Sequence, residues 1–285
     1  MPTYPTTTPI TATIQLAWGD VRIEASDRQD TTVDVTPRDS SHEADVRAAE
    51  QTRVEFSNGT LRVDGPRGWG AGILRKPGSV QLVVAVPSDS RVDAATGLGH
   101  VRTVGRLGDC HIRSGAGDIH LGDAASADLV TGFGSISAGH LSGSATGVTG
   151  SGGVRVVQVD GSAEVKNSNG DTWLGVVRGA VRVKSSNGGI VVDRARGDVK
   201  AATANGGVVV GCTESGTVDL KTALGRIEVG VVAGTAARLD LHTSFGSVVN
   251  ELDAADRPRP DEATVAISAQ TSAGDIVIRR VLERS

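Results

Sequence analysis

In the middle of the chain, short runs of alternating apolar and polar residues each end at a glycine. The segment 180–198 shows this most clearly, because Val181 and Val183 alternate with charged residues ahead of Gly188. Alternation with a period of two predicts a strand with one buried face and one exposed face. The glycines therefore mark turns between short strands.

The turn glycines recur about every 18 residues, which reveals an internal repeat. Each of them precedes an apolar residue by two positions: Gly99, Gly117, Gly134, Gly152, Gly170, Gly188, Gly206, Gly225, Gly246 and Gly274. A second glycine series falls half a period later, so each repeat holds two strands and two turns. Such units bury their apolar edges only by stacking on the next unit. We therefore predict an all-β fold, a two-sided parallel β-solenoid with about 18 residues per coil and roughly ten coils.

A column of small hydroxyl or amide residues stands three positions before the turn glycines. It reads Thr96, Ser114, Thr131, Thr149, Asn167, Ser185, Thr203, Thr222, Thr243 and Thr271. Such side chains can satisfy turn backbone groups or hydrogen-bond the equivalent residue in the next coil. A three-sided helix would need a six-residue repeat, and a propeller needs about 40 residues per blade, so both fit less well.

The two ends of the chain depart from the repeat. The predicted division is a β-rich N-terminal cap continuous with the solenoid at 1–90, regular coils at 91–250, and a charged insertion with the closing coil at 251–285. In the cap, residues 41–52 are the one expected helix, with Ser40 or Ser41 as N-cap. A hairpin is expected about Asn58–Gly59, and we expect Asn–Gly pairs within the coils to supply positive φ angles as well.

Composition agrees with a thin core and limits the function. The 285 residues include 38 Gly but only three Trp, three Phe and one Tyr. The net charge of −4 gives no electrostatic case for a nucleic-acid partner. No apolar run is long enough for membrane insertion, and the chain does not begin like a signal peptide. We expect a cytoplasmic location, with surface association by another route left open.

Four segments carry a resemblance to a known family. They are GDVRIEASDRQDTTVDV at 19–35, LVVAVP at 82–87, VKSSNGGIVV at 183–192 and ISAQTSAGDIVI at 267–278. With these features the chain resembles a bacterial β-strand-repeat family of unknown function that carries the label putative adhesin. The resemblance spans nearly the whole chain and implies an adhesin-like β-solenoid domain. It implies no catalytic residues.

Two sets of residues are candidate metal ligands, the Gly-Asp carboxylates and a group of histidines, and the sequence pattern disfavours both. Gly-Asp pairs end at Asp20, Asp118, Asp171 and Asp275, but the residue after the turn glycine varies too much for a calcium-binding roll. Four histidines fall in neighbouring coils, where alternation turns His111 and His120 outward, so zinc ligation is not expected. We therefore predict no metal, no cofactor and no metal-ligating residues.

The remaining candidate chemistry is also weak. The chain has no GxSxG nucleophile motif and no Cys/His pair, so we predict no catalytic residues and no enzyme. Cys110 falls in an inward column and Cys212 near an outer turn, too many coils apart for a disulfide. Two unpaired cysteines suit a reducing compartment.

Four large aromatic residues are the candidates for partner contact. Phe133 and Phe245 each stand directly before a turn glycine, Trp173 falls at an outward phase, and Trp69 lies in an irregular loop. Exposed aromatic side chains are common interface anchors. We predict a non-catalytic scaffold that binds a protein partner or self-associates. A glycan-binding or polysaccharide-acting β-helix protein is the alternative, and a filament former is a third hypothesis, disfavoured by the charged insertion and the cap.

Overall fold

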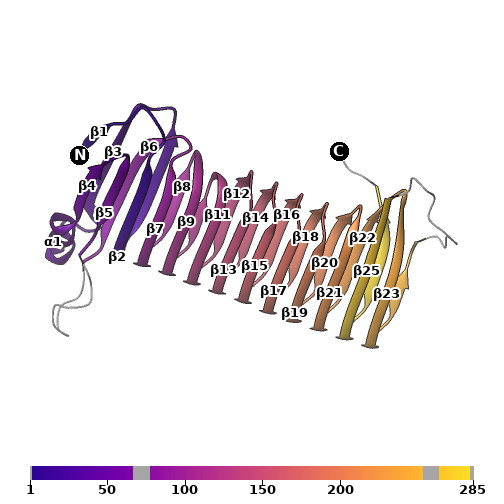
Figure 1. Ribbon diagram of the computed structural model, residues 1–285. Coiled ribbons are helices and arrows are strands. Elements are labelled where there is room, and N and C mark those ends of the chain that lie inside the picture. Colours follow the sequence, from indigo (N-terminus) through magenta and orange to yellow (C-terminus); the bar gives the residue numbers. More distant parts are fainter. Residues whose placement is uncertain (1, 67–77, 253–262, 283–285) are drawn as a thin grey trace. The chain divides into compact units, whose positions relative to one another are not determined.

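The chain folds almost entirely into β-strands. The computed structural model describes residues 2–66, 78–252 and 263–282. These residues form 26 strands and one nine-residue helix, so the predicted all-β class is confirmed. The chain divides into two compact units, here called unit 1 (1–141) and unit 2 (142–285). Within each unit the strands stack side by side (Figure 1).

Unit 1 holds the first half of the strands and the helix. They are β1 (Thr3–Pro5), β2 (Thr11–Ser26), β3 (Asp30–Pro37), α1 (Glu43–Gln51), β4 (Arg53–Ser57), β5 (Thr60–Asp64), β6 (Val80–Pro87), β7 (Arg91–Leu98), β8 (Val101–Val104), β9 (Arg106–Ala116), β10 (Ile119–Leu121), β11 (Asp123–Phe133) and β12 (Ile136–Leu141).

Strand β2 organises unit 1 because it forms a whole coil by itself. Its first half pairs in parallel with β5 and β7, and its second half, from Gly19 on, pairs with β6 and β8. From there, β7, β9 and β11 form one parallel series, and β8, β10 and β12 form the other. On the opposite side of β2, strands β3 and β4 pair antiparallel with β6 and β5, and β1 pairs antiparallel with β3. Antiparallel strands therefore end the stack on that side.

The helix and the hairpin of unit 1 lie where the sequence predicts them. Helix α1 packs against β3 and β6, and β4 and β5 form the hairpin about Asn58–Gly59, both of which have positive φ. The helix begins one residue later than expected for a serine cap: His42 is the N-cap, and no side chain caps the first turn. The predicted cap by Ser40 or Ser41 is wrong. The Asp45 carboxylate instead accepts the backbone N–H groups of Asp39 and Ser79, which fastens the helix to the strands beside it.

Unit 2 contains the more regular coils. Its strands are β13 (Ala145–Ser151), β14 (Val154–Val159), β15 (Ala163–Asn169), β16 (Thr172–Val177), β17 (Val181–Asn187), β18 (Ile190–Ala195), β19 (Val199–Asn205), β20 (Val208–Thr213), β21 (Gly216–Leu224), β22 (Ile227–Val232), β23 (Thr235–Phe245), β24 (Val248–Asn250), β25 (Ala263–Ala273) and β26 (Ile276–Val281).

Two parallel series build unit 2. One runs β13, β15, β17, β19, β21, β25, β23, and the other runs β14, β16, β18, β20, β22, β26, β24. In both series the middle strands pair with a shift of 18 residues, as in Val181 with Val199 and Ile190 with Val208. The predicted repeat length is confirmed for these coils.

The last two coils of unit 2 are exchanged relative to their order in the chain. Strand β25 lies between β21 and β23, so β23 and β24 occupy the end of the unit (Figure 1). The coil in 251–285, expected to close the stack, is therefore the second from this end. Glycine spacing could not show this exchange. Two parallel strands can pair whenever a crossover of about a dozen residues or more connects them, so neighbours in the sheet need not be consecutive in the sequence.

The core is lined by aliphatic side chains at the predicted inward positions. Val181, Val183, Ile190 and Val192 are all buried. The largest fully buried side chains of the described residues are all Ile or Leu. Two facing walls of short strands thus exclude aromatic rings from the core.

The column of hydroxyl residues forms hydrogen bonds with backbone carbonyls in the turns, which is one of the two roles predicted for it. Seven of its hydroxyls donate to the carbonyl of a turn glycine one coil away: Thr96 to Gly19, Ser114 to Gly99, Thr131 to Gly117, Thr203 to Gly188, Thr222 to Gly206, Thr271 to Gly225 and Thr243 to Gly274, at 2.9–3.3 Å. Asn167 departs from this scheme because its amide donates to both Gly152 and Gly170. The buried hydroxyl of Ser185, which would otherwise bond Gly170, has no partner.

The turn glycines have positive φ, and their neighbours do not. Gly188 has a φ of +135°, and a Cβ there would lie 2.1 Å from the Gly170 carbonyl oxygen. The expectation that the coil Asn–Gly pairs supply positive φ is confirmed at their glycines, Gly170, Gly188 and Gly206, while the asparagines themselves keep negative φ. The coil asparagines instead form an amide ladder, in which Asn205 donates to Asn187 and Asn187 to Asn169.

Gly188→Ala should destabilise the protein far more than Gly189→Ala. At Gly188 the added methyl group meets backbone and the positive φ strains an alanine, so we expect a loss of about 2 kcal/mol or more in the free energy of unfolding. At Gly189 the nearest atom lies at 3.5 Å, and we expect a change within about 1 kcal/mol. Denaturant unfolding of both variants measures the difference. Equal losses would contradict the turn geometry.

Thr203→Val should cost stability that Ser185→Ala does not. The first variant leaves the Gly188 carbonyl without its donor, which costs about 1–3 kcal/mol. The second removes a hydroxyl without a partner, so the free energy of unfolding should change by less than about 0.5 kcal/mol. Thermal and denaturant unfolding compare the two. A Ser185→Ala variant as unstable as Thr203→Val would contradict the interpretation that the Asn167 amide takes the place of the Ser185 hydroxyl at the Gly170 carbonyl.

Candidate interaction surfaces

Exposed apolar side chains line one edge of unit 1. Trp18, Leu98, Ala116 and Phe133 each stand directly before a turn glycine, and the strand register places them side by side in that order. We call these four residues the apolar ladder. Trp18, Leu98 and Phe133 are 38%, 44% and 68% exposed. At the usual spacing between strands, the ladder is a strip about 15 Å long.

Bare backbone adjoins the apolar ladder. The residues directly before Leu98, Ala116 and Phe133 are Gly97, Gly115 and Gly132, and all three glycines are exposed. No side chain at these positions shields the ladder. Apolar groups that gather in one strip, rather than scattering singly, mark an interaction surface.

In unit 2, the position directly before the turn glycine holds polar residues in the earlier coils and mostly apolar residues in the last coils. The amide ladder of Asn169, Asn187 and Asn205 continues in register to Leu224, Ala273 and Phe245. Leu224 is 56% exposed and Phe245 is 79% exposed. The large apolar groups of this column therefore lie in the last coils of the unit.

The predicted contact residues have different surroundings and do not form one site. Phe133 and Phe245 are strongly exposed in different units, and Trp69 lies outside the described residues. Trp173 on β16 is half-buried: the Arg155 guanidinium lies 3.8 Å from its ring centroid, and its indole N–H donates to Asp193. Contact with a partner stays a prediction for all four. Sequence reasoning missed Trp18 and Leu98, although both stand in the same column as Phe133.

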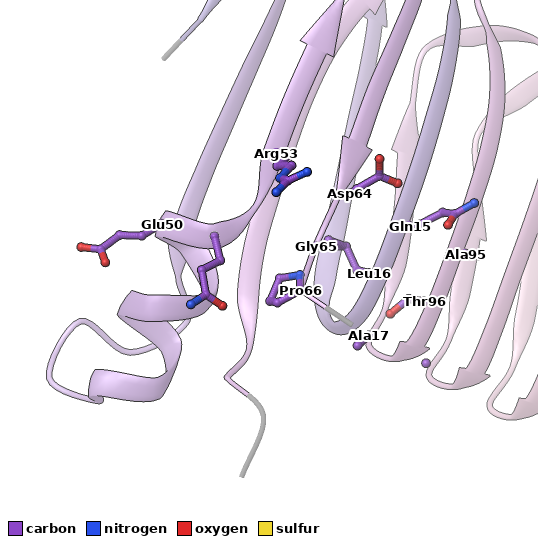
Figure 2. Close-up of a pocket in the computed structure, with 12 residues that line it drawn as sticks. Gln15, Leu16, Ala17, Glu50, Arg53, Asp64, Gly65, Pro66, Ala95 and Thr96 are labelled. Carbon is purple, nitrogen blue, oxygen red and sulfur yellow. The ribbon is translucent and has the colours of Figure 1, made fainter. Parts of the chain in front are cut away.

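A cleft in unit 1 adjoins the apolar ladder. Its volume is about 1100 Å³, and residues from β2, β4, β5 and β7 surround it together with the C-terminal end of α1 (Figure 2). Arg53 and Asp64, which face each other across β4 and β5, supply its charge with Glu50. Ala17 and Gly97 line it and directly precede Trp18 and Leu98. The cleft therefore borders the ladder along β2 and β7, which the sequence did not reveal because the segments that line the cleft are far apart in the chain.

The Gly-Asp carboxylates connect successive coils. Asp20, Asp118, Asp171 and Asp275 each accept the backbone N–H of the residue after a neighbouring turn glycine, at 2.8–2.9 Å. For Asp275, the N–H and the hydroxyl of Ser247 hold the pKa of the carboxyl below its ordinary value. These carboxylates therefore have a structural role in the turns. Within the described residues, no three His, Cys, Asp or Glu side chains come together as metal ligands.

Both cysteines are buried, and neither forms a disulfide. Cys110 is fully buried, as its inward position predicts, and burial, followed by the nearby Asp109 charge, raises the pKa of its thiol to about 12. Cys212 is also buried, as the last residue but one of β20, and it lies near the turn that follows this strand, as predicted. Such a thiol is a packing group and not a nucleophile.

Comparison with known proteins identifies the family. The profile of the family described as Toastrack DUF4097 matches residues 11–279, and the chain belongs to this family. The resemblance seen in the sequence is thereby confirmed. No curated protein matches the chain.

Solved structures with low sequence identity align over almost the full length. A putative adhesin from Parabacteroides merdae ATCC 43184 is 12% identical, with 98% of this chain and 95% of that chain covered and a TM-score of 0.42. A putative adhesin from Bacteroides fragilis NCTC 9343 is also 12% identical with the same coverage and a TM-score of 0.33. A putative lipid binding protein from Parabacteroides distasonis ATCC 8503 has the same identity and coverage and a TM-score of 0.37. In the described part of the chain, no helix has the length and apolarity needed to cross a membrane.

Native Cys110 should resist alkylation. In a Cys212→Ser background at pH 8, the burial and raised thiol pKa predict labelling by iodoacetamide only after unfolding. Mass spectrometry of native and denatured samples measures the labelled fraction. Rapid labelling of the native protein would show that β9 is more open than its burial indicates.

Proposed function

We propose that this chain is a non-catalytic, adhesin-like interaction protein that binds a protein partner through the apolar ladder and the adjoining cleft of unit 1. The observation that carries the proposal is the ladder itself. Three large apolar side chains, Trp18, Leu98 and Phe133, are held in one strip by strand register and face solvent. Their positions are fixed by backbone pairing before a partner arrives, so binding orders little of the protein.

The stacking of coils supports a scaffold role. In each unit, two parallel series carry inward aliphatic residues on facing strands, as Val183 and Ile190 do. This arrangement supports a two-sided β-solenoid as the architecture of each unit, with a cap of antiparallel strands and α1 in unit 1. A fold of this kind presents long, regular outer faces for contact with other macromolecules.

The exposed part of the ladder contributes to the energy of binding. Full burial of a large apolar side chain contributes about 1.5–3 kcal/mol, and aromatic residues contribute the most area. Three such residues supply several kcal/mol towards the cost of association. Arg53, Asp64 and Glu50 in the cleft add hydrogen-bonding groups that select the partner.

Glycan binding is the second candidate, and Trp173 favours it. Its ring lies on the outer side of β16 beside Arg155 and Asp193, which together offer an aromatic surface, donors and acceptors. Arg155 covers one part of this ring, so the remaining area is small. A glycan array that shows binding lost in Trp173→Ala but kept in Phe133→Ser would favour this candidate over a protein partner.

We also propose that the protein works in a reducing compartment such as the cytoplasm. Two buried cysteines that form no disulfide support this, because reduced thiols are typical of such compartments. Cell fractionation with antibody detection tests the location, and recovery at the cell surface would contradict it.

The triple variant Trp18→Ser, Leu98→Ser, Phe133→Ser should lose the protein partner without loss of folding. Trp18 and Leu98 are partly buried, so we expect the free energy of unfolding to fall by about 2–4 kcal/mol, less than the usual stability of a domain of about 5–15 kcal/mol. Affinity capture from the native host compares this variant with the wild type and with Val104→Ser, which removes an apolar side chain exposed outside the ladder. The expected result is a partner retained by the wild type and by Val104→Ser and lost from the triple variant. A partner kept equally by all three proteins would contradict the proposed surface.

A further inference from the structure

The end of unit 2 exposes an unpaired strand edge. Strand β23 pairs residue by residue with β25, and no other strand of the described residues pairs with its far edge. The strand is 11 residues long and contains neither proline nor lysine. Proteins usually blunt such edges with prolines, lysines, bulges or short strands, because unpaired N–H and C=O groups are a template for another strand.

The apolar interior is also open at this end. Leu239 and Leu241 stand in register with Ile267 and Ala269 of β25. The two β25 residues are buried, whereas the two leucines are only half-buried. On the other wall, Val248 is 45% exposed although its neighbour Ile276 is fully buried. The first coils of unit 1 differ, since antiparallel strands cover them and Leu61 and Val63 are buried there.

We infer that β23 pairs in antiparallel orientation with β23 of a second copy of this chain, which gives a closed two-fold dimer. The charges on the outer face of β23 select this occupant. Arg238 and Asp240 are exposed, and neither forms an ion pair with another described residue. In an antiparallel pair centred on Leu239, Arg238 lies opposite Asp240 of the partner subunit, and the symmetry repeats the contact.

The same register also extends the core. Leu239 then faces its own copy across the axis, and Ala237 faces Leu241 of the partner subunit, so the inward apolar positions of both chains meet. A pair centred on Asp240 would instead place two carboxylates opposite each other and Arg238 opposite His242, which is unfavourable. Charge and apolar pattern therefore agree on one register.

The symmetric arrangement also explains why growth stops at two chains. A head-to-tail contact would need a second open parallel coil to receive β23 and β24, and it would continue into a filament. The strands beyond β5 and β6 in unit 1 run antiparallel and do not offer that template. A two-fold contact uses up both open edges at once, which leaves none for a third chain.

Analytical ultracentrifugation of the full chain tests the dimer. From about 1 µM to about 100 µM, which spans weak to moderate affinities, we expect the average mass to rise from monomer towards dimer and no further. Either Asp240→Arg or Arg238→Asp places like charges opposite each other and should weaken the dimer at least tenfold. The double variant Arg238→Asp, Asp240→Arg restores opposite charges and should return the dissociation constant to within about threefold of the wild type. Lys221→Asp, an outward charge reversal on the interior strand β21, is the matched control and should leave the dimer unchanged.

Several results would overturn the inference. They are a monomer at every concentration, growth beyond a dimer, a dimer insensitive to the single charge reversals, or a folded double variant that stays monomeric. Circular dichroism and thermal midpoints confirm folding. If a charge variant unfolds, oxidative cross-linking decides: Leu239→Cys, on the two-fold axis, should give a disulfide-linked dimer, and Thr264→Cys on β25 should not. Absence of the Leu239→Cys dimer would refute the register independently of the ladder in unit 1.

Discussion

Contact between successive turns is the constraint on which the rest of the structure depends. The turn glycines lie so close to one another that a Cβ at Gly188 would overlap with the Gly170 carbonyl oxygen. Only a residue without a side chain allows this approach at positive φ. The hydroxyl of Thr203 then donates to the Gly188 carbonyl, and the carboxylate of Asp171 accepts the Gly189 N–H. Each turn is thereby fastened to the next coil through three kinds of contact.

Because of this constraint, the hydroxyl and carboxylate side chains near the turns form structural hydrogen bonds. The buried hydroxyls bond turn carbonyls, and the Gly-Asp carboxylates bond turn N–H groups, so neither set is free to act on a substrate. The outer charges form ion pairs along exposed faces, such as Lys166 with Glu164, and contribute little to stability there. The repeat does not require the apolar residue before the turn glycine or the cleft in unit 1.

The first strands of unit 1 and the last coils of unit 2 differ in how their outer edges are built. Antiparallel strands and α1 complete one side of unit 1, which removes an open parallel edge and covers the core. In unit 2 the chain places β25 inside and leaves β23 at the end with half-buried leucines. Interior strands form hydrogen bonds on both sides, whereas β23 pairs with β25 alone among the described strands. The apolar ladder belongs to unit 1 and the β23 edge to unit 2.

The sequence by itself determined the repeat, the strand class and the inward positions, because each is a local property read from period and glycine spacing. Val181, Ile190 and Cys110 are buried where alternation placed them. The sequence did not determine which segments lie side by side. Pairing between distant segments produces the exchange of β25 and β23, the alignment of Trp18 with Leu98, and the cleft between α1 and β7. Local patterns do not specify which distant strand supplies the partner, since any parallel strand of matching pattern offers the same hydrogen bonds. Only the tertiary structure decided which strand took each place, and with it which surfaces stay open for recognition.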